Sequence, residues 1–350
     1  MHAPHWTKSA SAIAALLLCV LMLAACGSGT NNNASPSPSG SNGEGAGESA
    51  AAPASAAASA SPEAEPATRS YTDALGRTVD IPTHAQRIVA HYYASELTAL
   101  EVPFVGTNYN NAKLSLSETQ LQGTEDIGGE NLVPNLEKTL SLAPDLIIVP
   151  DFLEAPDLDS LSKIAPTVAV KYSDDPFTHL RTLADILGQQ EAAERWIGAY
   201  EAKIEEKRKL VQPVIAEGET ASAFIVYGDK QLYVYNKQRL GPTLYDAFGF
   251  AQPAKIAELF QDKPDSLWET LSLELLPEYA GDRVFLVTPD NNEEAAAAAK
   301  DILNGPIWGS LPAVKNGKAY IVSGRWGLND PLTLDWLLDQ AADMLTKPQQ

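Results

Sequence analysis

Cysteine, histidine and positive charge are all scarce in this sequence. Its 350 residues hold two Cys and five His, and 25 Lys and Arg stand against 45 Asp and Glu, a formal net charge of −20. Two cysteines exclude a disulfide-dense scaffold and a zinc site built from four thiolates. The excess negative charge repels phosphate backbones, which disfavours a nucleic-acid partner.

The common catalytic motifs are missing from residues 71–350. This part contains no Gly-x-Ser-x-Gly, no Gly-x-x-x-x-Gly-Lys-Ser/Thr and no His-Glu-x-x-His. Its histidines, His84, His91 and His179, are far apart in the sequence, whereas a receptor for bare transition-metal ions gathers several His with carboxylates. We therefore expect no enzymatic activity, no cofactor and no metal ligated directly by the protein.

One long hydrophobic run, Ala10–Ala25, follows Lys8 near the start of the chain. At about 16 residues it is shorter than the roughly 20 of a membrane-spanning helix. It leads into Leu23-Ala24-Ala25-Cys26-Gly27, which resembles a bacterial lipobox. This predicts a signal peptide at 1–25, lipidation of Cys26 and an anchor on the extracellular face of the cell membrane. An uncleaved anchor helix is the alternative.

Residues 26–70 consist almost entirely of Ser, Ala, Gly, Asn, Pro and Glu. The segment has no apolar periodicity, so it cannot bury enough surface to offset the entropy of ordering the chain. We expect a flexible tether that lets a folded body reach a membrane partner.

Short apolar runs alternate with helical patterns in residues 71–350, which predicts an α/β fold with parallel strands. An opening hairpin turns at Leu75-Gly76. The predicted strands are 87–91, 103–106, 145–149, 168–170, 221–227, 231–235, 283–287 and 318–322. The predicted helices are 135–142, 176–187, 191–211, 244–248, 292–303 and 331–346. We expect an N-terminal lobe at 71–175, a helical connection at 176–212 and a C-terminal lobe at 213–350.

Two Rossmann-like lobes joined by one long α-helix can rock only slightly, so a ligand between them occupies a preformed cleft. The carboxyl ends of parallel strands face such a cleft. The candidate ligand-binding residues near these ends are Tyr92, Tyr93, Tyr233, Tyr235, Arg239, Arg325 and Trp326. Each aromatic ring alone is better explained by a place in the core. The two arginines in an acidic protein favour an anionic or oxygen-rich ligand.

Several motifs resemble one family. The lipobox, the tether and the run Gly129–Ile148, with Asn-Leu-Glu and Ala-Pro-Asp-Leu-Ile-Ile, resemble the helical-backbone class of ABC-transporter substrate-binding proteins. That class serves ferric siderophores, haem and cobalamin. The segments Arg239–Phe250, Leu276–Asp282 and Trp326–Asp335 are similar to those of Gram-positive ferric-hydroxamate receptors. The resemblance covers essentially all of residues 71–350.

The resemblance implies roles for particular residues. Glu137 and Glu274 match paired acids, one in each lobe, that dock onto arginines of a permease dimer. Arg239 matches an arginine that donates hydrogen bonds to the oxygens around the ferric centre, and Trp326 matches an aromatic wall of the pocket. The family pattern Gly-Arg-Gly is here Gln238-Arg239-Leu240, and Lys237 replaces a tryptophan. Lys237 would suit a more anionic cargo, such as a citrate-type siderophore.

These features predict a monomeric, lipid-anchored receptor that binds a ferric siderophore, of hydroxamate or citrate type, and delivers it to an ABC permease with its ATPase. Because the siderophore fills the coordination shell of the iron, the protein supplies no metal ligand. A haem receptor, with His91, Tyr92 or Tyr93 as axial ligand, and a cobalamin receptor are the rivals within the family. A tethered enzyme and a receptor that signals through a membrane sensor are the alternatives from other classes.

Overall fold

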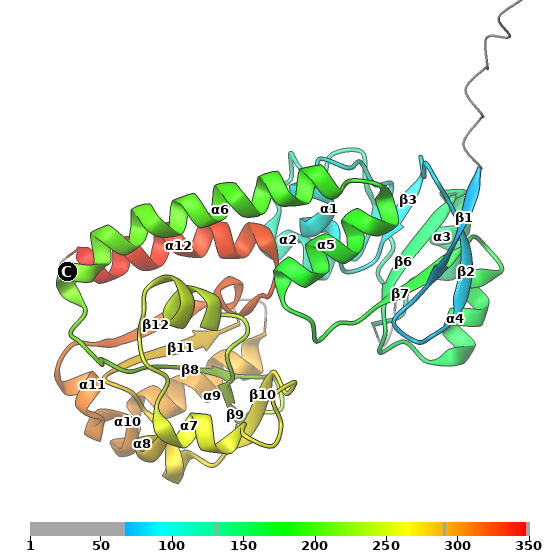
Figure 1. Ribbon diagram of the computed structural model, residues 1–350. Helices are drawn as coiled ribbons and strands as arrows, with labels where there is room; N and C mark the ends of the chain where they lie inside the picture. Colours follow the sequence, from blue (N-terminus) through cyan, green and yellow to red (C-terminus); the bar gives the residue numbers. More distant parts are fainter. Residues whose placement is uncertain (1–66, 130–131, 290–291, 348–350) are drawn as a thin grey trace, which may run out of the picture. The chain divides into compact units, whose positions relative to one another are not determined.

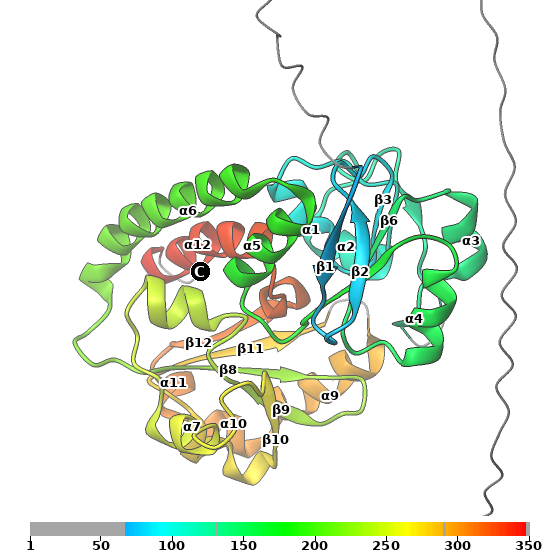
Figure 2. The same cartoon turned by 45° about the vertical axis from the view of Figure 1, so that its right-hand side comes forward.

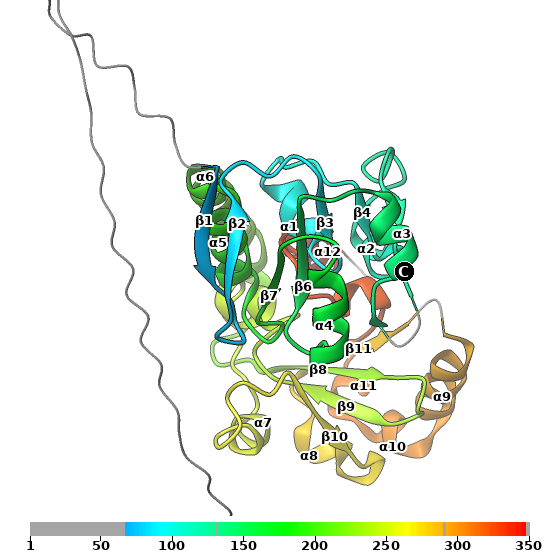
Figure 3. The same cartoon turned by 90° about the vertical axis from the view of Figure 1, so that its right-hand side faces the viewer.

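The computed structural model describes residues 67–129, 132–289 and 292–347. The predicted signal peptide, Cys26 and the tether up to residue 66 lie outside these ranges. The described residues belong to one compact unit. Their β structure consists of two five-stranded sheets and a two-stranded hairpin. Figures 1 and 3 show the two large sheets as separate sets of strands, one in each lobe. The expected two-lobed α/β architecture is confirmed.

The opening hairpin begins earlier than predicted. Strand β1 (Thr68–Thr72) pairs antiparallel with β2 (Thr78–Pro82), so Thr68 lies opposite Pro82. The boundary at residue 70 between tether and fold is therefore wrong, because residues 68–70 belong to the hairpin. These residues are polar and carry no apolar signal. Their order comes from backbone pairing and from the Ser70 hydroxyl, which donates to Asp80 at 2.6 Å.

The N-terminal sheet is entirely parallel, in the order β5-β4-β3-β6-β7. Its strands are β3 (Ile88–Ala90), β4 (Gly106–Thr107), β5 (Glu125–Asp126), β6 (Leu146–Pro150) and β7 (Thr167–Val170). The helices of this lobe are α1 (Ala94–Ala99), α2 (Tyr109–Ser115), α3 (Leu136–Ser141) and α4 (Ala155–Ser162). Every residue of β6 and β7 is buried, as expected for parallel strands covered on both faces.

The C-terminal sheet is mixed, in the order β10-β9-β8-β11-β12. Its strands are β8 (Ala221–Val226), β9 (Leu232–Tyr235), β10 (Trp268–Leu271), β11 (Arg283–Thr288) and β12 (Ala319–Ser323). Strands β8, β11 and β12 are parallel, whereas β9 runs antiparallel to β8 and to β10. The short turn between β8 and β9 explains the difference, because a parallel crossover needs a dozen or more residues.

Short helices surround the C-terminal sheet. They are the π-helix η3 (Pro242–Ala247), α7 (Ala254–Leu259), η4 (Leu273–Leu275), α8 (Leu276–Tyr279), α9 (Glu293–Asn304), α10 (Pro306–Ser310), α11 (Pro312–Lys315) and η5 (Gly324–Gly327). The 3-10 turn η5 follows the carboxyl end of β12. It therefore lies at the edge of the sheet where ligand sites of α/β proteins form.

Helices α5 (Pro176–Leu187) and α6 (Gln190–Val211), followed by η2 (Gln212–Val214), carry the chain from one lobe to the other. The Asp175 carboxylate caps α5 by accepting the N–H groups of Phe177 and Thr178, and Gly188 ends it in the left-handed region at φ 68°. Helix α6 spans about 33 Å at 1.5 Å per residue.

Helix α6 contributes to the cores of both lobes. Ala193 and Ile197 pack in the N-terminal core, whereas Tyr200 and Val211 pack in the C-terminal core. Figures 1 and 2 show α12 (Pro331–Thr346) running beside α6. The Nζ of Lys203 lies 2.9 Å from the Asp335 carboxylate of α12. The predicted lobe-bridging helix is thus confirmed, and a second helix supports it.

Candidate functional site

A cavity of about 530 Å³ opens between the two lobes. The C-terminal lobe supplies most of its wall, at the ends of β8, β9, β11 and β12. The N-terminal lobe contributes Leu114 of α2 and Tyr172, which follows β7. The lining residues from the C-terminal lobe are Ile225, Tyr227, Gly228, Asp229, Tyr233, Arg239, Trp268, Pro289, Asn292, Gly324, Gly327 and Leu328. The expected cleft between lobes therefore exists.

Arg239 is the one cation among the described residues that line this cavity, and its conformation is fixed. The residue is 6% exposed. Its guanidinium carbon lies 4.8 Å from the Trp268 ring centroid, and Nη1 donates to the carbonyl of Gly327. Its Nε is buried without a hydrogen-bond partner among the described residues. A stacked and tethered guanidinium loses little freedom when it meets an oxygen-rich ligand, which favours binding.

The backbone at Arg239 is unusual, because its φ is 62°, in the left-handed region. A non-glycine residue in this region has a conformational cost of order 1 kcal/mol. Such a backbone conformation persists only where neighbouring groups hold it. Asn329 supplies one such contact, because its side-chain oxygen accepts the Arg239 N–H at 3.1 Å.

Aromatic rings form the rest of the wall around Arg239. Tyr227 packs edge-on against Tyr233, with ring centroids 5.3 Å apart, and its ring lies 5.8 Å from that of Trp268. The Tyr233 hydroxyl donates to the carboxylate of Asp229. The cavity therefore presents flat apolar surface, one guanidinium and one carboxylate.

A smaller cavity of about 40 Å³ adjoins the first. Tyr172, Arg239 and Leu328 line both cavities and so form the wall between them. Tyr92 lines the smaller cavity and is absent from the lining of the large one. Burial raises the pKa of Tyr92 to about 12, so its phenol is neutral at ordinary pH.

Two of the predicted ligand residues, Tyr93 and Tyr235, are absent from the lining of the large cavity, although Tyr93 lines the smaller one. Tyr93 is 2% exposed, and its hydroxyl donates to the Val170 carbonyl at 3.1 Å. Tyr235 is 1% exposed and lies beneath Arg239, whose guanidinium carbon is 5.7 Å from the ring centroid. A Cβ at Gly327 would come within 2.7 Å of the Tyr235 hydroxyl. Only glycine leaves room for this packing.

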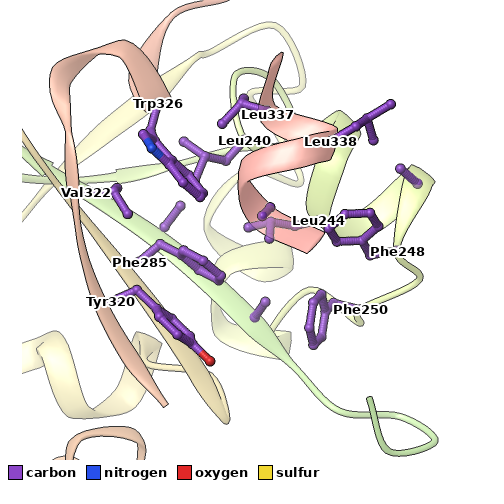
Figure 4. Close-up of a cluster of buried hydrophobic side chains, with 14 of the residues drawn as sticks. Leu240, Leu244, Phe248, Phe250, Phe285, Tyr320, Val322, Trp326, Leu337 and Leu338 are labelled. Atoms are coloured by element: carbon purple, nitrogen blue, oxygen red, sulfur yellow. The ribbon is translucent and has the colours of Figure 1, made fainter. Parts of the chain in front are cut away.

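Trp326, predicted to form a wall of the pocket, is absent from the lining of the large cavity and belongs to the core of the C-terminal lobe. The residue is 5% exposed and stacks on Phe285, with ring centroids 6.1 Å apart. Figure 4 shows Trp326 among the core side chains beside Leu240 and Phe285. The η5 turn directs its ring into the sheet, so the neighbouring Gly327 and Leu328 line the cavity instead.

Arg325 and Lys237 are also outside the lining of the large cavity. The Arg325 guanidinium lies 4.3 Å from the Trp336 ring centroid, and its Nη2 donates to the Ser115 carbonyl at 3.3 Å. Arg325 thus joins η5 to α2 across the lobes. Lys237 does not line the cavity, so the structure gives no contact through which it would select an anionic cargo.

Glu137 and Glu274 are exposed, one in each lobe. Glu137 lies in the first turn of α3, whose cap Asn135 accepts the Lys138 N–H at 3.0 Å. Leu136 and Leu140 on the same helix are 40% and 62% exposed. Glu274 lies in η4 next to Leu275, which is 40% exposed. Each acid is therefore a charged group beside accessible apolar surface.

Sequence reasoning missed Tyr172 and Trp268 as lining residues. Tyr172 follows β7 directly, so the rule about carboxyl ends of strands could have found it. Trp268 opens β10, an antiparallel strand that carries charged Glu269 and that the apolar pattern does not reveal. Asp229, in the β8–β9 turn, carried no signal because turns are commonly polar.

Nε2 of His91 and the hydroxyl of Tyr93 both bond to backbone carbonyls of the N-terminal lobe, whereas Nδ1 of His91 is buried without a hydrogen-bond partner among the described residues. His91 is completely buried, and its Nε2 lies 2.8 Å from the Leu132 carbonyl oxygen. Burial lowers the pKa of His91 to about 4. Within the described residues, no group of three or more His, Cys, Asp and Glu is arranged to hold a metal ion. None of the helices in these ranges is long and apolar enough to cross a membrane.

Comparison with known proteins now decides the family. Residues 126–325 match the periplasmic binding protein family. The chain belongs to this family. It is 30% identical over 285 residues to the iron(3+)-hydroxamate-binding protein YxeB of Bacillus subtilis, covering 80% of this chain and 85% of that protein.

Solved structures of family members have the same fold. The FhuD protein from S. pseudintermedius superimposes with a TM-score of 0.68 at 26% identity, covering 81% of this chain and 99% of that one. FhuD2 from Staphylococcus aureus with bound ferrioxamine B gives a TM-score of 0.64 at 26% identity, covering 75% and 98%. Members of this family are substrate-binding transport proteins rather than enzymes.

Proposed function

We propose that this protein is the substrate-binding component of an ABC importer that captures a ferric siderophore and delivers it to a membrane permease. The observation that carries the proposal is the buried, stacked and tethered guanidinium of Arg239 in an aromatic-lined cavity between the lobes. The names of the relatives support it, because one is an iron(3+)-hydroxamate-binding protein and another holds ferrioxamine B.

The cavity suits a cargo that already carries its iron ligands. A hydroxamate siderophore surrounds Fe³⁺ with oxygen atoms, which accept hydrogen bonds from a guanidinium. The organic scaffold between the chelating groups packs against the rings of Tyr172, Tyr227 and Trp268. The siderophore thus provides the ligands of the iron, and the protein recognises the outside of the complex without catalysing a reaction.

Delivery of the cargo requires a permease that contacts both lobes of the protein. Glu137 and Glu274 offer one exposed carboxylate in each lobe, which suits docking onto arginines of a permease dimer driven by its ATPase. Lipidation of Cys26 would hold the monomeric protein at the extracellular face of the cell membrane, and residues 27–66 would serve as its tether. A body whose lobes share α6 presents these acids at a nearly fixed spacing.

Haem and cobalamin remain the rival cargoes. The three residues considered as axial haem ligands are poorly placed for that role, because His91 and Tyr93 bond to backbone carbonyls and Tyr92 lines the small inner cavity. The large cavity offers Tyr172 and Tyr227 in their place. A hydroxamate complex presents iron-bound oxygen atoms to the guanidinium of Arg239, which supports a siderophore as the cargo.

Titration of tryptophan fluorescence tests the proposal. Trp268 lies in the cavity wall, so a ferric complex bound beside it should quench its emission. We expect saturable quenching by ferrioxamine or another ferric hydroxamate, and weaker or no response to ferric citrate, haemin and cyanocobalamin. Arg239→Ala should weaken binding by about 1.5–3 kcal/mol, as for a hydrogen bond to a charged group. A Soret shift with haemin and no response to any ferric siderophore would reject the proposal.

A further inference from the structure

The cavity holds a carboxylate that oxygen-rich iron chelation does not need. Asp229 lies in the exposed turn between β8 and β9 and lines the cavity. Its Oδ2 accepts the Tyr233 hydroxyl, and its Oδ1 accepts the Gln231 N–H at 3.0 Å. The Tyr233 hydroxyl and then the Gln231 N–H hold the pKa of Asp229 below its usual range. The cavity therefore contains a fixed negative charge as well as a fixed positive one.

Aromatic rings stand between these two charges. Contacts run from Asp229 to Tyr233, from Tyr233 to Tyr227 at 5.3 Å, from Tyr227 to Trp268 at 5.8 Å, and from Trp268 to Arg239 at 4.8 Å. Of the ion pairs within the described ranges, none joins Asp229 to Arg239. Each of the two charged side chains is thus available to contact a bound ligand, because they do not pair with each other.

A carboxylate beside aromatic rings is the usual environment for an organic ammonium group, because the ring faces and the carboxylate both attract a cation. The ferric trihydroxamate core is electrically neutral, because its three hydroxamate charges balance Fe³⁺. Arg239 can donate to hydroxamate oxygens without a formal counter-charge. The charge of Asp229 therefore calls for a cation elsewhere on the cargo.

We propose, on the basis of the function proposed above, that the cargo is a ferric trihydroxamate carrying a protonated primary amine, which Asp229 receives beside the rings of Tyr227 and Tyr233 while Arg239 meets the hydroxamate oxygens. A triscatecholate complex, with three net negative charges, is disfavoured by the same carboxylate. The net charge of −20 adds a long-range attraction for a cationic complex.

A matched pair of ligands tests this inference in the purified protein. Ferrioxamine B has a free amine, and its N-acetyl derivative has the same ferric core without the positive charge. Dissociation constants for both are measured by tryptophan quenching with wild-type protein, with Asp229→Asn and with Asp301→Asn. Asp301 is an exposed acid of α9 outside the cavity lining, so its variant controls for the change in net charge.

We expect the wild type to bind ferrioxamine B roughly three-fold to twenty-fold more tightly than the acetylated complex, the combined range for an exposed charge pair and a cation–π contact. Asp229→Asn should bind the two complexes alike, and Asp301→Asn should keep the preference. Equal affinities in the wild type, or an unchanged preference in Asp229→Asn, would overturn the inference while leaving siderophore capture intact. Failure to bind either complex would overturn the proposed function as well.

Discussion

The side chain of Asn329 joins Arg239 to the opposite lobe. Its oxygen accepts the backbone N–H of Arg239 at 3.1 Å, and its Nδ2 donates to the carbonyl of Asp174 at 3.2 Å. Arg239 belongs to the C-terminal lobe, whereas Asp174 precedes α5 in the N-terminal lobe. One amide thus holds the strained backbone of the arginine and fixes its position relative to the other wall of the cavity.

Asn329→Ala should therefore weaken cargo binding although Asn329 is not among the residues that line the large cavity. Loss of the contact frees the Arg239 backbone to leave the left-handed region, and we expect about a two-fold to ten-fold loss of affinity for a ferric hydroxamate, the range for one or two neutral hydrogen bonds. Quenching titrations measure the change. Asn316→Ala, at an exposed site after α11, is the control. Equal affinities in the two variants would contradict the positioning role.

Buried Glu96 should make stability fall as pH rises. Glu96 is 2% exposed, and its Oε1 lies 3.8 Å from Nδ1 of His179. Burial, and then the charge of Asp330, raise the pKa of Glu96 well above its ordinary value. A raised pKa stabilises the fold below the unfolded value near 4.5, and this stability is lost as pH rises through the folded pKa.

Glu96→Gln removes this dependence while keeping the shape of the protonated acid. The melting temperature of the variant should gain on the wild type as pH is raised from 5 to about 8, measured by calorimetry at several pH values. A constant difference across that range would show that Glu96 does not carry the raised pKa.

His91 should have the opposite effect at low pH. Burial lowers its pKa from 6.5 to about 4, so the unfolded chain binds a proton in this interval that the folded protein does not. The stability is complete above pH 6.5 and is lost as pH falls through about 4, a loss of about 3 kcal/mol. Urea unfolding should show a shallower acid loss in His91→Gln than in the wild type. Parallel curves would contradict the assignment.

Charge reversal at Glu137 and Glu274 should separate capture from delivery. The variant with both acids changed to Lys should bind cargo with unchanged affinity, because neither residue lines the large cavity. Uptake of iron by cells should fall by about ten-fold or more, since like charges would then meet at the permease. Glu154→Lys with Glu278→Lys, two other exposed acids, is the control. Lost affinity in the first variant would show that the acids act on the cargo site.

Local signals in the sequence predict the long helices α5, α6, α9 and α12 because the ends of such helices are chemically marked, whereas short helices such as α1, α2 and α4 are missed. Asp175 caps α5 and Asp330 caps α12, each followed directly by Pro, and both ends lie where the sequence places them. The apolar runs likewise locate β6, β8 and β11. Strands β5 and β10 carry charged residues, so their place depends on pairing with neighbours that the local sequence does not reveal.

The candidate site is harder to predict because a ring that lines a cavity and a ring that fills a core have the same local sequence. Arg239, Tyr92 and Tyr233 line cavities, whereas Trp326 and Tyr235 belong to the core. The direction of each side chain depends on the twist and curvature of elements such as η5. The packing of whole elements decides that Gly327 and Leu328 line the large cavity, whereas Trp326 does not.

The coordination of iron in the complex tests the central claim most directly. X-ray absorption spectroscopy of the protein loaded with ferrioxamine B reads the atoms bound to Fe³⁺, and crystals of the same complex place the iron by its anomalous scattering. The account predicts a shell of hydroxamate oxygens identical to that of the free chelate, with the iron in the cavity beside Arg239. An oxygen or nitrogen of the protein in that shell, or a protein that binds bare Fe³⁺ but no chelate, would contradict it.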